Sequence, residues 1–224
     1  MIKPRVKICC ISSVEEANLA IKYGASALGL VSEMPSGPGV IALEQIAEIA
    51  GKVPPPVGTF LLTCKQTVDE IAAQHEVCRT NTIQICDSFI DSYDDLRKAL
   101  PAVKLVQVVH VGGEESLREA IEISEKVDAI LLDSGNQALE IKELGGTGRT
   151  HDWTISRRIV ESVKAPVFLA GGLKAENVAE AVAKVQPFGL DLCSSVRAGG
   201  KLDEEKLRGF FAEIDNFNAK SPSH

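Results

Sequence analysis

Short apolar runs alternate with amphipathic stretches along the whole chain. Eight runs rich in β-branched and aliphatic residues predict strands, at 6–9, 27–31, 57–62, 82–86, 105–109, 129–133, 167–170 and 188–193. The stretch after the first run, "SVEEANLAIKYG", has a serine start signal and ends in Gly24, and it predicts a helix. Eight strand-and-helix units within 224 residues favour a (β/α)8 TIM barrel over a doubly wound sheet, which usually has fewer strands at this length.

The composition is compatible with one domain and excludes several classes of partner. With 45% hydrophobic residues and no long linker, residues 1–224 should form a single barrel, with a small polar tail at about 218–224 expected to fray. The net charge is −7 and its charges are interspersed, so no nucleic-acid partner is expected. No apolar run suits a signal segment or a membrane span, which leads us to expect a cytoplasmic protein with no membrane partner.

The six cysteines are spread along the chain without the density of a disulfide-stapled scaffold. No pair of cysteines combines with a second pair, or with histidines, at the spacing typical of a zinc site. We therefore expect reduced thiols and no metal ion.

A barrel of this kind predicts where its chemistry lies, because catalytic groups gather at the C-terminal ends of the strands. The stretch "FLAGGLKAENV" ends a strand at Gly171 and Gly172 and opens a helix, so that bare backbone N–H groups can approach an anion. Ser194 and Ser195 follow the last strand, and the loops after strands seven and eight often bind phosphate in this fold. The two glycines could also make only a tight turn.

A third glycine-rich stretch, "ELGGTGRTHDW", follows the sixth strand. Asp152 within it is expected to cap the next helix. We interpret Gly146, Thr147 and Gly148 as part of a loop that closes over a ligand, although an exposed turn would have the same composition.

A thiol and a carboxyl group end two of the predicted strands. Asp133 closes "AILLD", where burial would raise its pKa and make it a general acid, unless it only accepts backbone hydrogen bonds. Cys9 closes the first strand and could serve as a base, with Lys7 on the same side of that strand lowering its pKa, or it could be an inert packed thiol. An acid and a base across a bound phosphosugar suit an aldose-to-ketose isomerisation, which needs no cofactor.

Several ordered motifs together resemble the phosphoribosylanthranilate isomerase family, over nearly the whole chain. The family's Lys-Ile-Cys-Gly-Ile-Thr corresponds to "KICCIS", its Leu-Leu-Asp to "LLDS", and its Gly-Gly-Ser/Thr-Gly with Phe-Asp-Trp to "GGTGRTHDW". Its terminal segments correspond to "AGGLKAENV" and "LCSSVRAGGKLDEEKL".

The resemblance implies an Amadori rearrangement in tryptophan biosynthesis, acting on a phosphorylated sugar. Cys9 would remove the proton from the sugar C2 and Asp133 would protonate the ring oxygen. We also expect Lys7 and Gln84 to bind substrate, and the same resemblance implies that the backbone amides of Gly171, Gly172, Ser194 and Ser195 bind the phosphate. Cys10 occupies a family glycine position, and we do not expect the strained disulfide that could join it to Cys9.

The chain departs from the family at the aromatic end of the substrate. The family's arginine, which pairs with the anthranilate carboxylate, has no counterpart in "SEMPSGPGVI". The family's His-Gly after the fourth strand is replaced by Cys86 and Asp87, and His151 replaces a phenylalanine.

Three hypotheses follow from these departures. The chain is a divergent phosphoribosylanthranilate isomerase in which Arg149 or another cation substitutes, or a paralogue that isomerises another phosphosugar, or a barrel that only binds such a ligand. The retained acid and base favour the first hypothesis.

Overall fold

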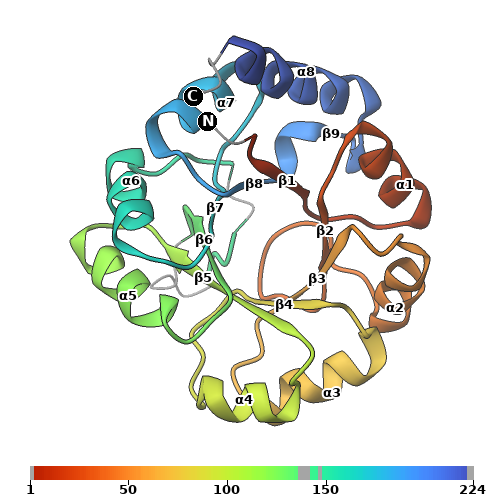
Figure 1. The fold of residues 1–224 in the computed structure, drawn as a ribbon. Coiled ribbons are helices and arrows are strands. Elements are labelled where there is room, and N and C mark those ends of the chain that lie inside the picture. Colours follow the sequence, from red (N-terminus) through yellow and green to blue (C-terminus); the bar gives the residue numbers. More distant parts are fainter. Residues whose placement is uncertain (1–2, 136–141, 146–147, 221–224) are drawn as a thin grey trace.

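The expected TIM barrel is confirmed. The computed structural model describes residues 3–135, 142–145 and 148–220, and in it eight parallel strands pair in sequential order, with β8 returning to β1 to close the barrel (Figure 1). The strands are β1 (Arg5–Ile8), β2 (Ala27–Val31), β3 (Gly58–Thr63), β4 (Thr82–Ile85), β5 (Lys104–His110), β6 (Ala129–Asp133), β7 (Val167–Leu169) and β8 (Gly189–Leu192).

Helices form a ring around the strands (Figure 1). They are α1 (Val14–Tyr23), α2 (Leu43–Lys52), α3 (Val68–Cys78), α4 (Tyr93–Ala99), α5 (Glu114–Ser124), α6 (Trp153–Ser162), α7 (Ala175–Val185) and α8 (Glu204–Lys220). The predicted start and stop signals act as expected: the side chain of Ser13 caps α1, Gly24 ends it at φ 108°, and Asp152 caps α6.

The chain after β8 contains structure that the sequence pattern did not reveal. A single 3₁₀ turn (η1, Ser194–Val196) follows β8, and a small antiparallel pair, β9 (Arg197–Ala198) and β10 (Lys201–Leu202), precedes α8. Residues 218–220, expected to fray, continue α8, and residues 221–224 lie outside the described part.

The strands separate two apolar layers because successive side chains point to opposite faces. Val6, Ile8, Leu28 and Leu30 point outward and pack under the helices. A smaller cluster, which includes Phe60, fills the barrel interior. Burying both faces of every strand explains the nearly continuous apolar runs of the sequence.

The polar residues of the strand ends gather above the inner cluster. Cys9 directly follows β1, Asp133 ends β6, and Gly171 follows β7 by two residues. Parallel strands bring these C-terminal ends to one rim, which is where the fold places active sites. Within the described ranges, no helix combines the length and apolarity needed to cross a bilayer.

Candidate functional site

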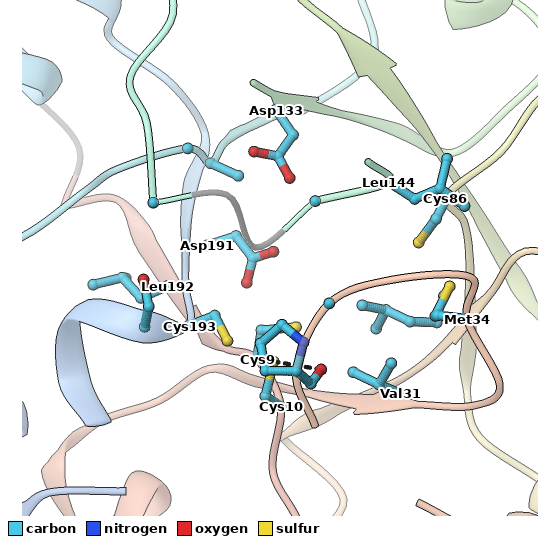
Figure 2. A pocket seen from close by; sticks show the side chains of 18 of the residues that line it. Cys9, Cys10, Val31, Met34, Cys86, Asp133, Leu144, Asp191, Leu192 and Cys193 are labelled. Atoms are coloured by element: carbon cyan, nitrogen blue, oxygen red, sulfur yellow. Dashed lines mark hydrogen bonds between the residues drawn. The ribbon is translucent and has the colours of Figure 1, made fainter. Parts of the chain in front are cut away.

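A pocket opens at this rim, at the C-terminal ends of the strands. Its space is about 720 Å³ including the open mouth. Figure 2 shows Asp133 on one side of the pocket and Cys9 on the other, with Asp191 between them in this view. The pocket therefore brings together both predicted catalytic residues and places a second carboxylate beside them.

Cys9 lies on the pocket wall beneath the mouth, with 6% of its surface exposed. Its backbone N–H donates to the Leu192 carbonyl at 2.7 Å, which fixes the thiol at the seam between β1 and β8. The neighbouring Cys10 thiol lowers the pKa of Cys9; burial opposes this shift and the charge of Lys7 assists it. The surroundings therefore favour the thiolate, the form that can act as a base.

Lys7 lies below the pocket floor rather than in its lining. Its side chain is fully buried and its Nζ lies 2.8 Å from Oδ2 of Asp191, its register partner on β8. Burial opposes the charge of Lys7, but the attraction of Asp191 and Cys9 raises its pKa, so it remains a cation. The structure thus gives Lys7 an electrostatic position beneath the site, without the direct pocket contact expected of a substrate ligand.

Asp191 is a pocket residue that the sequence reasoning missed. Its Oδ1 is buried without a hydrogen-bond partner in the structure, although it faces the pocket. The available signal was the same as for Asp133, an acidic residue within an apolar strand, here "GLDL". After this strand, the sequence pattern indicated only Ser194 and Ser195 as pocket residues.

Asp133 ends β6 with 7% of its surface exposed. Burial raises the pKa of Asp133, while the Ser134 N–H, which donates to its Oδ1 at 2.7 Å, opposes the shift. Gly145 passes directly over this carboxyl, since a Cβ on Gly145 would lie 2.6 Å from Oδ2. A carboxyl enclosed in this way retains its proton to higher pH than usual, as a general acid requires.

Two loops at the β7 and β8 ends form one corner of the pocket, where phosphate binding is expected from the sequence, and we call it the phosphate corner. Gly171 and Gly172 line the pocket at φ 79° and 62°, in the left-handed region that glycine tolerates. Ser194 and Ser195 line the same corner from η1, and the buried Ser195 Oγ has no hydrogen-bond partner in the structure. Backbone amides and an unpartnered hydroxyl group together suit an anion.

The loop after β6 reaches the phosphate corner. Gly148 lines the pocket, and a Cβ there would lie 3.7 Å from Ser194 Oγ. Gly146 and Thr147, which were predicted to contact the ligand, lie outside the described residues. The described part of the loop thus lies at the same corner as η1.

Polar and sulfur groups from β4 complete the inner wall. Gln84 lines the pocket, is 3% exposed, and has a buried Oε1 that finds no hydrogen-bond partner among the described residues. Its Nε2 contacts the Cys86 thiol at 3.7 Å, and burial raises the pKa of that thiol. Cys86 therefore replaces a family histidine with a neutral, pocket-lining thiol.

The loop after β2 covers the side of the pocket nearest Cys10. Met34, Ser36, Gly37 and Pro38 from this loop line the pocket, and the Cys10 thiol donates to the Pro38 carbonyl at 3.6 Å. Cys10 itself has φ 63°, a left-handed conformation expected at a position where the family has glycine. The Cys10 side chain thus gives the loop a packing partner that a glycine would not provide.

Among the described residues, no Lys or Arg side chain lines the pocket, but two cations lie near its rim. Arg149 pairs with Glu143, and the Arg149 carbonyl accepts from Ser134 Oγ beside the phosphate corner. Lys142 pairs with Asp87 at 2.7 Å, and its carbonyl accepts from Ser36 Oγ of the β2 loop at 2.6 Å. Lys142 is therefore a cation next to the loop that lacks the family arginine, and Lys65, which pairs with Glu33 of that loop at 3.4 Å, is another.

Comparison with known proteins identifies relatives along almost the full chain. The family model for N-(5'-phosphoribosyl)anthranilate isomerase matches residues 6–213. The isomerase of that name from Methanosarcina acetivorans is 35% identical, over 95% of this chain and 94% of its own. The Haloferax volcanii isomerase is 36% identical, over 93% and 91%.

Solved structures show the same relationship. Phosphoribosyl anthranilate isomerase from Thermotoga maritima superimposes with a TM-score of 0.80 at 28% identity, covering 95% of this chain and 99% of its own. Another isomerase, solved with reduced 1-(o-carboxyphenylamino)-1-deoxyribulose 5-phosphate, gives 0.77 at 26% identity, with coverage of 95% and 99%. By the family match and these relatives, the chain belongs to the phosphoribosylanthranilate isomerase family.

Proposed function

We propose that the protein is a phosphoribosylanthranilate isomerase of tryptophan biosynthesis. It converts N-(5'-phosphoribosyl)anthranilate to the carboxyphenylamino-deoxyribulose phosphate by an Amadori rearrangement. Family membership supports the reaction, and one structural observation carries it to this chain: a thiol with a lowered pKa and a carboxyl with a raised pKa line opposite sides of one pocket. The cytoplasmic location expected from the sequence stays a prediction.

The chemistry we propose consists of two proton transfers. Asp133 donates a proton to the ring oxygen as the sugar opens, and the Cys9 thiolate removes the proton from C2 of the opened form. Each group has the ionisation its step needs, since burial favours the protonated Asp133 carboxyl and the neighbouring Cys10 thiol favours the Cys9 thiolate. Neither transfer requires a redox cofactor.

The phosphate of the substrate would bind at the β7 and β8 loops. Support comes from the Gly171 and Gly172 backbone, the buried Ser195 hydroxyl group and Ser194, all of which line one corner. An anion held there is close to the β1 end, since β1 and β8 are paired. The sugar would then extend from this corner toward Cys9 and Asp133.

We further propose that Lys142 receives the anthranilate carboxylate in place of the missing arginine. Its backbone carbonyl accepts from Ser36 of the β2 loop, whereas the Arg149 backbone carbonyl accepts from Ser134 and the Arg149 side chain pairs with Glu143. Asp87, which is 5% exposed, holds the Lys142 ammonium at 2.7 Å and would share it with the substrate. A charge-assisted contact of this kind contributes about 1.5–3 kcal/mol, or one to two decades in binding.

The main test follows the loss of phosphoribosylanthranilate fluorescence as the compound is generated enzymatically in the assay. The parent should turn it over, and Cys9→Ser and Asp133→Asn should each lower kcat by roughly 10² or more. Both variants should still bind reduced 1-(o-carboxyphenylamino)-1-deoxyribulose 5-phosphate in calorimetry. A folded parent that binds the analogue without turnover would support a barrel that only binds; turnover unaffected by either substitution would refute the assigned roles.

The cation assignment is tested by two matched variants. Lys142→Gln should raise KM about tenfold or more with kcat little changed, because it removes ground-state binding. Arg149→Gln should change KM by less than threefold. The opposite ranking would transfer the carboxylate contact to Arg149, and no effect from either variant would contradict a cation contact from this loop.

A further inference from the structure

Three cysteine thiols meet at one corner of the pocket, where β1 and β8 end. Cys193 and Cys9 both raise the pKa of the neighbouring Cys10 thiol, and Figure 2 shows the three side chains together. All three line the pocket, and Cys193 is partly exposed there. Neighbouring thiols in an open pocket are chemically reactive toward oxidants. This chemistry is separate from the proton transfer assigned to Cys9.

Strand pairing sets the separation of two of these cysteines. Ile8 and Leu192 are register partners, and the Cys9 N–H donates to the Leu192 carbonyl at 2.7 Å. Cys9 follows Ile8 and Cys193 follows Leu192, so the two cysteines lie side by side where β1 and β8 end. Adjacent strands are about 4.8 Å apart, which falls within the 4.4–6.8 Å between Cα atoms that a disulfide requires.

Cys10 is a poor partner for Cys9. Neighbouring Cα atoms are only about 3.8 Å apart across a trans peptide, below the disulfide range. The side chain of Cys10 is also held by the β2 loop, through its contact with the Pro38 carbonyl and its packing on Gly39. The geometry therefore favours Cys193 over Cys10 as the residue that reacts with an oxidised Cys9.

We propose that Cys9 and Cys193 form a reversible, peroxide-driven disulfide that blocks the pocket. The Cys9 thiolate attacks one oxygen of hydrogen peroxide, the O–O bond breaks, and hydroxide leaves, giving a sulfenic acid. The Cys193 sulfur, after losing its proton, attacks the Cys9 sulfur, and the S–O bond breaks with release of water. Two thiols and one peroxide thus give one disulfide and two waters, and a dithiol reductant reverses the change.

The consequence for activity rests on the proposed function. A disulfide would consume the thiolate that we assign as the base and would join β1 to β8 beside the phosphate corner. Peroxide should therefore abolish isomerase activity, and dithiothreitol should restore it. Formation of the disulfide is measured by mass and does not depend on that activity.

The experiment treats the full-length parent with a small excess of hydrogen peroxide and counts thiols after denaturation. The count should fall from the six of the sequence to four, and unreduced peptide mapping should join the peptide of Cys9 to that of Cys193. Cys10→Gly should still form the bond, which identifies Cys9 as the partner. Cys64→Ser is the matched control, a partly exposed cysteine outside the pocket lining, and should lose two thiols as the parent does.

Cys193→Ser and Cys193→Ala should form no internal disulfide, and their Cys9 should proceed to sulfinic acid, a loss that dithiothreitol does not reverse. A disulfide that persists in both variants, or one that forms in Cys9→Ser at the parent rate, would overturn the proposal. A parent that retains all its thiols under peroxide would overturn it as well. If the disulfide forms but the parent never shows isomerase activity, only the proposed function fails.

Discussion

The Cys10 thiol donates a hydrogen bond to the Pro38 carbonyl at 3.6 Å, and the Cβ of Cys10 fills the space that a side chain on Gly39 would need. A Cβ on Gly39 would lie 2.5 Å from that of Cys10, closer than real Cβ atoms approach. The β2 loop therefore packs against a side chain where the family has glycine. This contact joins the loop that lacks the family arginine to the residue beside the assigned base.

The first prediction concerns this contact. Gly39→Ala should destabilise the fold by about 2–4 kcal/mol, because it adds a steric clash to a φ of 84° that disfavours any side chain. The same change in a Cys10→Gly background should cost about 0.5–3 kcal/mol less, since the two residues are in contact. Urea unfolding of the four proteins of the cycle measures the difference, and strict additivity would contradict the direct contact.

The second prediction concerns pH. The neighbouring Cys10 thiol is the main cause of the lowered pKa of Cys9, so Cys10→Gly should raise that pKa. Because the base acts as a thiolate, kcat/KM rises with pH through the Cys9 pKa, and the acidic limb should move to higher pH in the variant. The pH dependence of kcat/KM and of iodoacetamide alkylation at Cys9 should shift together. Profiles that superimpose on the parent would show that Cys10 does not tune the base.

The third prediction concerns the phosphate corner. A Cβ on Gly172 would lie 2.7 Å from the Arg149 carbonyl carbon and 2.8 Å from the Thr150 nitrogen, so Gly172→Ala should displace that backbone and raise KM about tenfold. Gly199→Ala is the control, since Gly199 also has positive φ, 55°, but nothing within 4 Å of its Cβ. Steady-state kinetics of both variants test this, and equal effects would mean that backbone strain alone is responsible.

The fourth prediction concerns His151, whose Nε2 lies 2.7 Å from Ser156 Oγ while its Nδ1 is buried without a hydrogen-bond partner in the structure. Burial lowers the pKa of His151 to about 4, against 6.5 for an ordinary histidine, and Asp152 only partly opposes it. The unfolded chain therefore binds a proton between these values that the folded chain does not. Stability should be unaffected above pH 6.5 and should fall by up to about 3 kcal/mol as the pH decreases toward 4.

His151→Phe, which restores the family residue, should remove most of this loss. Chemical unfolding at pH 7.5 and pH 4.5 gives the comparison. The variant and the parent should differ more at the lower pH than at the higher one. An equal difference at both values would show that the histidine does not titrate with folding.

The sequence predicted the barrel because its signals are local. Alternating apolar runs, capping residues such as Ser13, and the stop at Gly24 each act over a few residues, and their repetition admits few folds. Two predicted strands match the observed ones, and the bounds of the others differ by no more than one residue, at ends where hydrogen bonding rather than composition decides. The 3₁₀ turn Ser194–Val196 was not predicted from the local sequence pattern.

The site was predicted in part, and the errors have a common cause. Cys9 and Asp133 stand at strand ends, and strand order alone places them on one rim. Lys7 was expected to bind substrate, but it pairs with Asp191 beneath the floor of the pocket. The two residues are 184 positions apart, so no local pattern reveals this contact. The contacts that place Asp191 at the pocket and Lys142 beside the β2 loop also join distant positions, so the local sequence pattern did not indicate either residue.

The sequence by itself thus determined the fold, the family resemblance and the two groups assigned to proton transfer, since these depend on residue type and spacing. Only the tertiary structure decided which residues lie next to one another: Cys193 beside Cys9, Gly39 against Cys10, and Lys142 near the β2 loop. Ionisation and reactivity depend on such neighbours, because charge, burial and hydrogen bonding act over a few ångströms in space and not along the chain.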